Sequence, residues 1–408
     1  MKNIAIIGGG IAGISAAYYF QERYKVTLFE KQNYIGGNNR SIDIGNGIKV
    51  PLVVILFPRK KLFSQTISLA NKFGLKVQPK VIGHSFWENH QMKMPSLLNS
   101  QNYSKFLLST QIFKNLRDLH FMLRRFPKLR FTHQKSIQDL TELYNLPPEL
   151  IKTILIPLAC LYLTMSYKDV SNLPLNIFAD WYYKYMLYTP WASRQFSFIK
   201  GGNHQLVDKL INNTVFTSKL ETPIQKVHRN SKNITICAND QEYDFDKVIF
   251  STPPITTLSL LSSPSSAEKN ILSAFETQEV KCTLHTAKEY SYKNKITLNT
   301  IDNDIDKKQV ITTYSEECFD YDITPKHFVT IERPDSNLIP TNKIIYHQNF
   351  TVPKTTVKSL NACESLPKLN DNNLNSYFCG ASFGKYFYHE DAIVSSQIIN
   401  SLDKRINS

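Results

Sequence analysis

The first residues whose types and spacing could do chemistry are glycines near the amino terminus. Gly8, Gly10 and Gly13 form a GxGxxG motif, and Ile11 and Ala12 lie between its last two glycines. In such a turn the first glycine permits a tight backbone, the second lets a pyrophosphate approach, and the third lets a helix pack closely on a strand. Free N–H groups at the start of the following helix then face the phosphates. The motif therefore predicts a dinucleotide-binding site.

Two strands and a helix are needed to position this motif. Residues 2–7 are an isoleucine-rich run typical of a buried strand, and residues 14–20 continue the chain as a small-residue helix. Residues 25–29 are predicted to form the second strand. Glu30 stands at its end, where a carboxylate can accept hydrogen bonds from a ribose diol, and Lys31 follows within the same predicted site. A glycine turn without a nucleotide is the alternative, but the order strand, glycines, helix and acid favours the dinucleotide.

A second pair of glycines bears on which dinucleotide is bound. Gly36 and Gly37 stand six and seven positions beyond Glu30, and Asn38 and Arg40 follow them closely. This arrangement resembles the GG motif of flavoproteins in the amine oxidase, phytoene desaturase and protoporphyrinogen oxidase superfamily. Glycines there let the backbone approach the diphosphate and ribityl chain without a Cβ in the way. The resemblance implies FAD, with Arg40 either as a phosphate ligand or as a surface cation.

Three later segments agree with this interpretation. FIKGGNHQLVDKL, at 198–210, is a glycine turn leading into a helix, and residues 214–230 are predicted to form two strands joined by a short turn. In the superfamily the residue after the Thr-Pro pair, here Ile224, contacts the adenine through its main chain. Residues 244–254 are predicted to return as a strand beside the first one, and two prolines end it.

The stretch NSYFCGASFGKYFYHEDAIVSSQIINSL completes the predicted cofactor site. It indicates a strand, a glycine turn at Gly380, and a closing helix that starts near Glu390, with Asp391 and Ala392 in its first turn. The positive N-terminus of that helix is expected to face the pyrimidine edge of the flavin and to stabilise negative charge on the reduced ring. His389 could approach the flavin as well, or it could pack there with a hydrogen bond to backbone.

The similarity runs through most of the chain and is most specific in YFCGASFGKYFYHEDAIVSS. The chain resembles a bacterial group of NAD/FAD-binding amine oxidoreductases related to the flavoprotein domain of some cyclopropane fatty acid synthases. It departs from that group at Ala392, where a glycine is usual, and at Asn38 and Asn39, where a His-Ala pair is usual. The resemblance implies an α/β, Rossmann-like FAD-binding fold of the GR2 type with an interleaved α+β substrate domain. The predicted FAD-binding domain is discontinuous, at 1–76, 196–254 and 367–408, and the substrate domain takes 77–195 and 255–366.

The implied activity is that of an FAD-dependent oxidoreductase, which transfers a hydride from an amine or a lipid-like, fatty acyl substrate to flavin N5. No catalytic residue is assigned, because the first lysine after the returning strand, Lys269, lies too far along to match the lysine that holds water near N5 in many amine oxidases. Two alternatives stay open. One is a redox-neutral flavoprotein that resembles UDP-galactopyranose mutase, and the other is a non-catalytic, flavin-bound partner of a lipid-modifying enzyme.

The predicted substrate domain is rich in aromatic residues, which suit an apolar pocket although many of them would serve as ordinary core. They are Phe86, Trp87, Tyr162, Tyr167, Phe178, Trp181, Tyr182, Tyr183, Tyr185, Tyr188 and Trp191. Residues 112–128 form a predicted amphipathic helix with apolar residues on one face and Lys and Arg on the other. This helix could lie against anionic lipid, or its basic face could simply be solvated.

The bulk composition limits the partners. The chain has 48 Lys and Arg against 34 Asp and Glu, a net charge of +14, which favours anionic partners. No nucleic-acid-binding motif accompanies the charge, so no nucleic acid is expected. Six cysteines without a CxxC pair predict no metal site. Residues 154–165 are apolar but fall short of the roughly 20 that cross a bilayer, and the start lacks a secretory signal. We therefore expect a cytoplasmic protein, with peripheral membrane association through 112–128 as an option.

Overall fold

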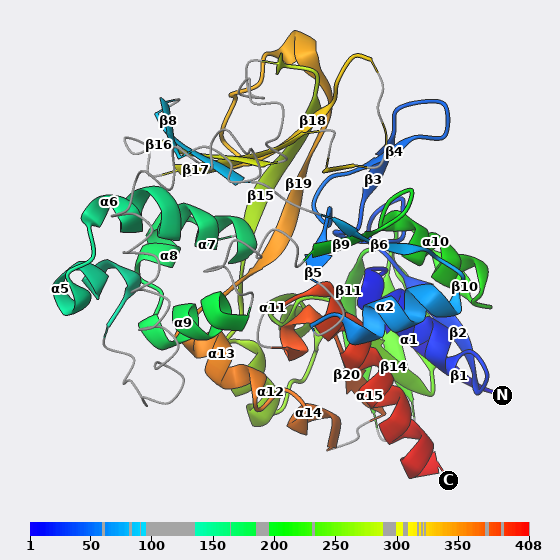
Figure 1. Cartoon of the computed structure of the whole chain (residues 1–408). Coiled ribbons are helices and arrows are strands. Elements are labelled where there is room, and N and C mark those ends of the chain that lie inside the picture. The colour runs from blue at the N-terminus through cyan, green and yellow to red at the C-terminus, as the bar shows by residue number, and fades with distance from the viewer. Residues whose placement is uncertain are drawn as a thin grey trace.

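A five-stranded parallel sheet contains the first strand of the chain (Figure 1). Its strands, in spatial order, are β10 (Thr217–Lys219), β2 (Tyr24–Phe29), β1 (Lys2–Ile7), β14 (Lys247–Phe250) and β20 (Ser376–Phe378). The computed structural model describes residues 1–58, 62–80, 84–89, 91–94, 135–163, 165–184, 196–230, 233–288, 299–304, 309–315, 318–319, 321, 324–371, 375–384 and 387–407.

Both faces of this parallel sheet are buried, which explains the unbroken apolar run of β1. Ile4 and Ile6 face a layer of helices, whereas Ala5 and Ile7 face a small antiparallel sheet. The helices are α1 (Ile11–Phe20), α2 (Ser64–Lys72), α10 (His204–Asn212) and α15 (His389–Asn407). The antiparallel strands are β11 (Ile224–Arg229), β12 (Ile234–Ala238) and β13 (Gln241–Phe245).

A seven-stranded mixed sheet forms the upper part of Figure 1. Its order is β19 (Ile344–Lys354), β15 (Glu276–His285), β18 (Phe328–Glu332), β17 (Gln309–Ser315), β16 (Asn299–Asp304), β7 (His84–Glu88) and β8 (Gln91–Met94). The β16–β7 pair is parallel and the other pairs are antiparallel. This sheet combines β7 and β8 with five strands from residues 276–354.

Short helices pack beside the β7 and β16 end of the mixed sheet, with Phe86 of β7 in their shared core. They are α5 (Leu140–Tyr144), α6 (Pro148–Leu150), α7 (Ile156–Leu163), α8 (Tyr167–Ser171) and α9 (Leu175–Lys184), and a π-helical turn (Ile151–Leu155) precedes α7. Most of the described apolar residues of the run at 154–165 are buried protein core, as predicted, with Pro157 in the first turn of α7. Across the described residues, no helix combines the length and apolar character needed to span a bilayer.

Small elements join the two main sheets. These are the pair β3 (Ser41–Asp43) and β4 (Lys49–Pro51), the sheet of β5 (Phe57–Pro58), β9 (Phe196–Ile199) and β6 (Val77–Lys80), and the helices α11 (Pro254–Leu260), α12 (Ser266–Leu272), α13 (Val357–Cys363) and α14 (Lys368–Asp371). Leu260, Leu272 and Cys363 pack in the core beneath the parallel sheet. The core beneath the parallel sheet thus takes in residues of α11, α12 and α13.

The elements predicted around the glycine motifs are confirmed. The first strand, its helix, the second strand and the returning strand correspond to β1, α1, β2 and β14, and the closing helix begins at His389. The predicted helix at 112–128 lies outside the described residues, as do Tyr185, Tyr188 and Trp191. Phe178, by contrast, is fully buried core.

Candidate functional site

The GxGxxG turn lies at the carboxyl end of β1. Gly8 has a φ of +105°, and its N–H donates to the carbonyl of Phe29 at 2.9 Å. A Cβ on Gly13 would lie 1.9 Å from the Gly8 carbonyl oxygen, so helix α1 packs against the turn with no room for a side chain. Gly10 is the opposite case, because no atom lies within 4 Å of the place its Cβ would occupy. The turn is therefore tight on one side and open on the other, as a pyrophosphate requires.

Glu30 secures this turn from the end of β2. Its side chain is buried; Oε2 accepts a hydrogen bond from Gly9 N–H at 2.6 Å, and Oε1 accepts one from Gln32 N–H at 2.9 Å. Each carboxylate oxygen keeps a further lone pair that can accept a ribose hydroxyl. Lys31, also in the predicted site, is exposed to solvent beside it.

The predicted adenine contact lies next to Glu30. Thr222 N–H donates to the carbonyl of Glu30 at 2.9 Å, and Glu221 N–H donates to Gln32 at 3.0 Å. These bonds hold the Thr-Pro segment against the end of β2. Ile224, two residues on, begins β11 and is partly buried.

The second glycine pair packs directly on the first turn. Gly36 N–H donates to the carbonyl of Gly9 at 2.8 Å, and a Cβ on Gly37 would lie 3.0 Å from Gly10 Cα. Both residues of the pair have positive φ, +135° at Gly36 and +56° at Gly37. The two motifs therefore pack backbone against backbone, with glycine at the points of contact.

Of the residues after the GG pair, Asn38 contacts the mixed sheet and Arg40 stacks on an aromatic ring. The Asn38 amide donates to the carbonyl of Thr351 on β19 at 3.0 Å, which ties the turn to the mixed sheet. Arg40 stacks on Tyr34, with its Cζ 4.0 Å from the ring centroid. Its Nε is buried without a hydrogen-bond partner among the described residues, as are Asn39 Oδ1 and Ser41 Oγ. Arg40 is thus a cation with a buried donor that no described residue satisfies.

Tyr34 is a residue that the sequence-based prediction missed. Its hydroxyl accepts from Gln348 Nε2 at 2.9 Å, and the Gln348 Oε1 accepts from the Tyr346 hydroxyl at 2.9 Å. Burial raises the pKa of Tyr34 above its usual value. This chain of polar groups runs from the GG turn along β19. The only signal in the sequence was an aromatic residue two positions before the glycine pair.

The N-terminus of α15 lies at the same edge of the parallel sheet as the glycine turns. Gly380 follows β20, and no atom lies within 4 Å of where its Cβ would be. Its N–H donates to Ser395 Oγ at 3.0 Å, and Ser396 Oγ donates to the carbonyl of Ala12 at 2.9 Å. These contacts fix α15 alongside α1, so both helix N-termini face the same region. Ala392 is buried in this packing.

The acidic residues of the α15 first turn have partners within the chain. Glu390 is buried, and its carboxylate accepts from the N–H groups of Gln65 and Thr66, both at 2.8 Å, and from the Thr66 hydroxyl at 2.6 Å. Asp391 Oδ2 accepts from Tyr388 N–H at 2.9 Å. The Glu390 carboxylate therefore caps α2, and any cofactor contact there falls to the main chain of this turn.

His389 differs from these neighbours. Both of its ring nitrogens are buried, and neither has a hydrogen-bond partner in the described part of the chain. Burial lowers the pKa of His389 to about 4, so the imidazole is neutral at neutral pH. Within the described ranges, the imidazole also makes no hydrogen bond to backbone.

These observations fit a bound dinucleotide with a flavin. Two open glycine surfaces, at Gly10 and Gly380, and unsatisfied polar atoms on Arg40 and His389 lie around one edge of the parallel sheet. Glu30 lies between the two glycine turns. The side chains present are those that a diphosphate, a ribose and a polar ring edge would need.

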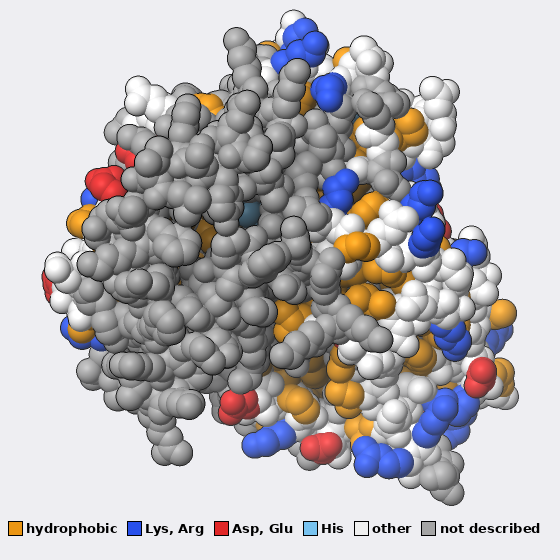
Figure 2. All heavy atoms as spheres, in the orientation of Figure 1, with side chains coloured by type: hydrophobic (Ala, Val, Ile, Leu, Met, Phe, Trp, Pro, Cys, Tyr) orange, Lys and Arg blue, Asp and Glu red, His pale blue; other side chains and the backbone are white. Residues whose placement is uncertain are grey.

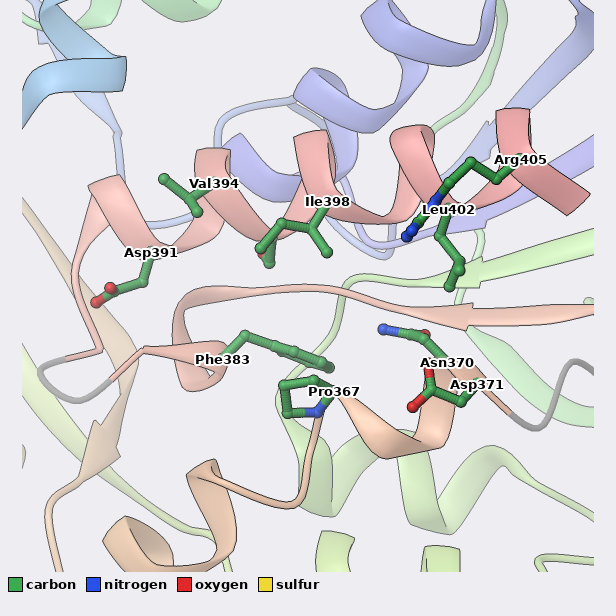
Figure 3. Close-up of a pocket in the computed structure, with 10 residues that line it drawn as sticks. Pro367, Asn370, Asp371, Phe383, Asp391, Val394, Ile398, Leu402 and Arg405 are labelled. Carbon is green, nitrogen blue, oxygen red and sulfur yellow. The ribbon is translucent and has the colours of Figure 1, made fainter.

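A separate cavity of about 140 Å³ runs along the outer side of α15 (Figure 3). Val394, Ile398 and Leu402 of α15 face Phe383 and Pro367 across it. Its volume is below the roughly 300–1,000 Å³ of typical small-molecule sites, and of the predicted site residues it includes Asp391 alone. We therefore do not place the cofactor or the substrate there.

The face of the molecule drawn in Figure 2 carries several kinds of side chain. Figure 2 shows Lys and Arg side chains spread over the coloured part of this face, with apolar side chains between them. In the described part of the chain, no group of three His, Cys, Asp or Glu side chains is arranged to hold a metal ion.

Comparison with known proteins agrees with this geometry. Residues 6–65 match the family model of an NAD(P)-binding Rossmann-like domain. A 93-residue stretch is 34% identical to a 1-hydroxycarotenoid 3,4-desaturase of Flavobacterium sp. (strain P99-3). That match covers 22% of this chain and only 19% of the desaturase.

Similar folds occur among solved structures over the full length of the chain. A CLA-producing fatty acid isomerase from P. acnes has a TM-score of 0.69 at 15% identity, with 98% of both chains covered. A putrescine oxidase has a TM-score of 0.70 at 12% identity, with 100% of this chain and 99% of the other covered. Cyclohexylamine oxidase from Brevibacterium oxydans IH-35A has a TM-score of 0.65 at 13% identity, with 100% of both covered. The chain therefore shares its fold with these three enzymes over its full length.

Proposed function

We propose that this chain is an FAD-dependent oxidoreductase that removes a hydride from an amine or a lipid-like, fatty acyl substrate. The observation that carries the proposal is the meeting of both glycine turns, Glu30 and the α15 N-terminus at one sheet edge. When bound there, a flavin supplies the electron sink for hydride transfer. The chain supplies position and electrostatics, and the mixed sheet stands over the same edge through the Asn38 contact with β19.

The residues have separable roles in this proposal. Glu30 would accept hydrogen bonds from the ribose, and the open backbone at Gly10 would admit the diphosphate. Arg40 would offset phosphate charge, since no ion pair to it is found among the described residues. The α15 N-terminus would favour negative charge on the reduced ring through its dipole.

The proposed function specifies the substrate less closely than the cofactor. The likeness to a putrescine oxidase and a cyclohexylamine oxidase supports amines as candidates, and the likeness to a fatty acid isomerase supports acyl lipids. An anionic membrane surface is a further proposed partner, through the basic helix predicted at 112–128. The net charge of +14 supports that contact electrostatically.

An absorbance spectrum of the purified protein, followed by anaerobic titration with amines and with acyl lipids, tests the proposal. We expect a yellow protein with a flavin band near ~450 nm that bleaches with one class of substrate. Protein that takes up no FAD would overturn the proposal.

The same titration separates the alternatives. Turnover of an acyl lipid without net bleaching, and only with pre-reduced flavin, would indicate a redox-neutral enzyme. FAD that binds but responds to neither class, in a protein that copurifies with a stable partner, would indicate a non-catalytic role.

A further inference from the structure

His389 has the most unusual environment among the polar residues around the proposed FAD site. The residue as a whole is partly buried. Both ring nitrogens, however, are inaccessible to solvent and lack hydrogen-bond partners within the described residues. Buried polar atoms in folded proteins are almost always hydrogen-bonded. Both nitrogens of this imidazole therefore need a partner that the described residues do not supply.

The neighbours of His389 show that this is not a loosely organised turn. On one side, Tyr388 N–H is satisfied by Asp391 Oδ2. On the other, Glu390 accepts three hydrogen bonds from the start of α2. Since the adjacent residues have fixed partners, local rearrangement to satisfy His389 would break contacts that the chain already makes.

The position of His389 relates it to the cofactor. It is the first residue of α15, and seven residues later Ser396 contacts the carbonyl of Ala12 in the glycine motif. At its other end α15 reaches Lys247 and Tyr24, the first residues of β14 and β2. The helix therefore runs from the carboxyl edge of the sheet to its amino edge, and His389 lies at the carboxyl edge with the glycine turns.

We propose that His389 is a cofactor-positioning residue, whose neutral imidazole hydrogen-bonds the polar edge of the flavin. This inference rests on the proposed function. A neutral imidazole has one N–H donor and one acceptor, and the pyrimidine edge of a flavin carries both carbonyl acceptors and an N–H donor. The pKa of about 4 agrees with a neutral ring, so the helix dipole, and not a histidine charge, would offset electrons on the flavin.

The test replaces the imidazole with an apolar side chain and compares apoprotein with FAD-loaded protein. His389→Leu removes polar atoms that are unsatisfied in the apoprotein, so its Tm without FAD should equal or exceed that of the wild type. With FAD the change removes a hydrogen bond, so FAD affinity, measured by quenching of flavin fluorescence, should fall roughly tenfold. The flavin absorption band should also shift.

His389→Gln keeps a donor and an acceptor and should recover part of the affinity. His347→Leu, at an exposed position on β19, is the matched control and should leave both quantities unchanged. Unchanged FAD affinity and spectrum in His389→Leu, with the wild type binding FAD, would show that His389 only packs. If His389→Leu does not fold, His389→Ala takes its place. FAD affinity that is as low in His389→Gln as in His389→Ala would then decide against the proposal. Wild-type protein that binds no FAD would overturn the proposed function itself.

Discussion

At the residue scale, two glycines of one motif have opposite surroundings. Gly13 has no space for a Cβ, which would meet the Gly8 carbonyl oxygen at 1.9 Å, whereas nothing lies within 4 Å of the corresponding place on Gly10. The backbone φ of Gly10 is −68°, which any residue can adopt. The packing therefore requires glycine at position 13, whereas nothing in the described fold requires it at position 10.

This contrast gives a prediction for a pair of alanine variants. Gly10→Ala should leave the thermal stability of the apoprotein within about 0.5 kcal/mol of the wild type and should weaken FAD binding at least tenfold, because the added methyl projects into the open approach. Gly13→Ala should destabilise the apoprotein itself. Calorimetry of the apoproteins and titration with FAD distinguish the two effects.

The paired design also shows how the interpretation could fail. If Gly10→Ala binds FAD as tightly as the wild type, the open side of the turn is not where the diphosphate lies. If Gly13→Ala folds with unchanged stability, the close packing of α1 on the turn is not needed.

At the scale of elements, α2 depends on a residue far away in sequence. Its N-cap residue, Phe63, offers no side-chain hydrogen bond. Glu390, 325 positions from Gln65, supplies the cap from the first turn of α15. Buried donors at a helix N-terminus need such a partner, so the two helices stabilise each other.

We predict that Glu390→Gln destabilises the protein by about 1–3 kcal/mol. The amide keeps one acceptor oxygen but turns an N–H₂ group toward the N–H donors of α2. Urea unfolding of the apoprotein measures the effect, and Glu364→Gln, the same change at an exposed site, should have almost none. Equal stability of the two variants would contradict the capping role.

The contact between Glu390 and α2 is an example of what the sequence alone does not predict. The glycine motifs, β1, α1 and β2 could be predicted because their signals are local and their spacing reflects backbone geometry. The sequence places Glu390 and Asp391 at the cofactor because they lie in the first turn of a helix whose N-terminus is expected to face the flavin. Their side-chain partners could not be foreseen, since α2 reaches α15 only after the whole chain has folded. The unsatisfied imidazole of His389 was hidden for the same reason.

At the scale of the whole molecule, Asp403 joins parts of the chain that are distant in sequence. It is fully buried and pairs with Lys247 Nζ at 2.8 Å and with Arg23 Nη2 at 3.1 Å. The hydroxyls of Tyr24 and Tyr377 donate to it at 3.0 and 2.9 Å. The starts of β2, β14 and β20 are thereby tied to the end of α15, at the sheet edge opposite the cofactor site.

This cluster should make stability depend on pH. Burial by itself raises the pKa of Asp403, but hydrogen bonds from Lys247 and Tyr377 and the nearby cations outweigh it and lower the pKa below its usual value. A carboxylate with a lowered pKa stabilises the fold above its unfolded pKa of about 3.9, and this stabilisation is lost as the pH falls through the lower folded value.

We therefore predict that Asp403→Asn costs about 3–5 kcal/mol at neutral pH, because it leaves Lys247 buried without its counter-charge. The difference in unfolding free energy between wild type and variant should narrow below about pH 4, because protonation of the wild-type carboxylate then removes its charge. Urea unfolding at several pH values measures both. Asp335→Asn is the control, since that carboxylate pairs with Arg333 at the surface and should give little change at any pH. A constant gap between wild type and Asp403→Asn across the acidic range would mean that lost packing, and not lost charge, explains the cost.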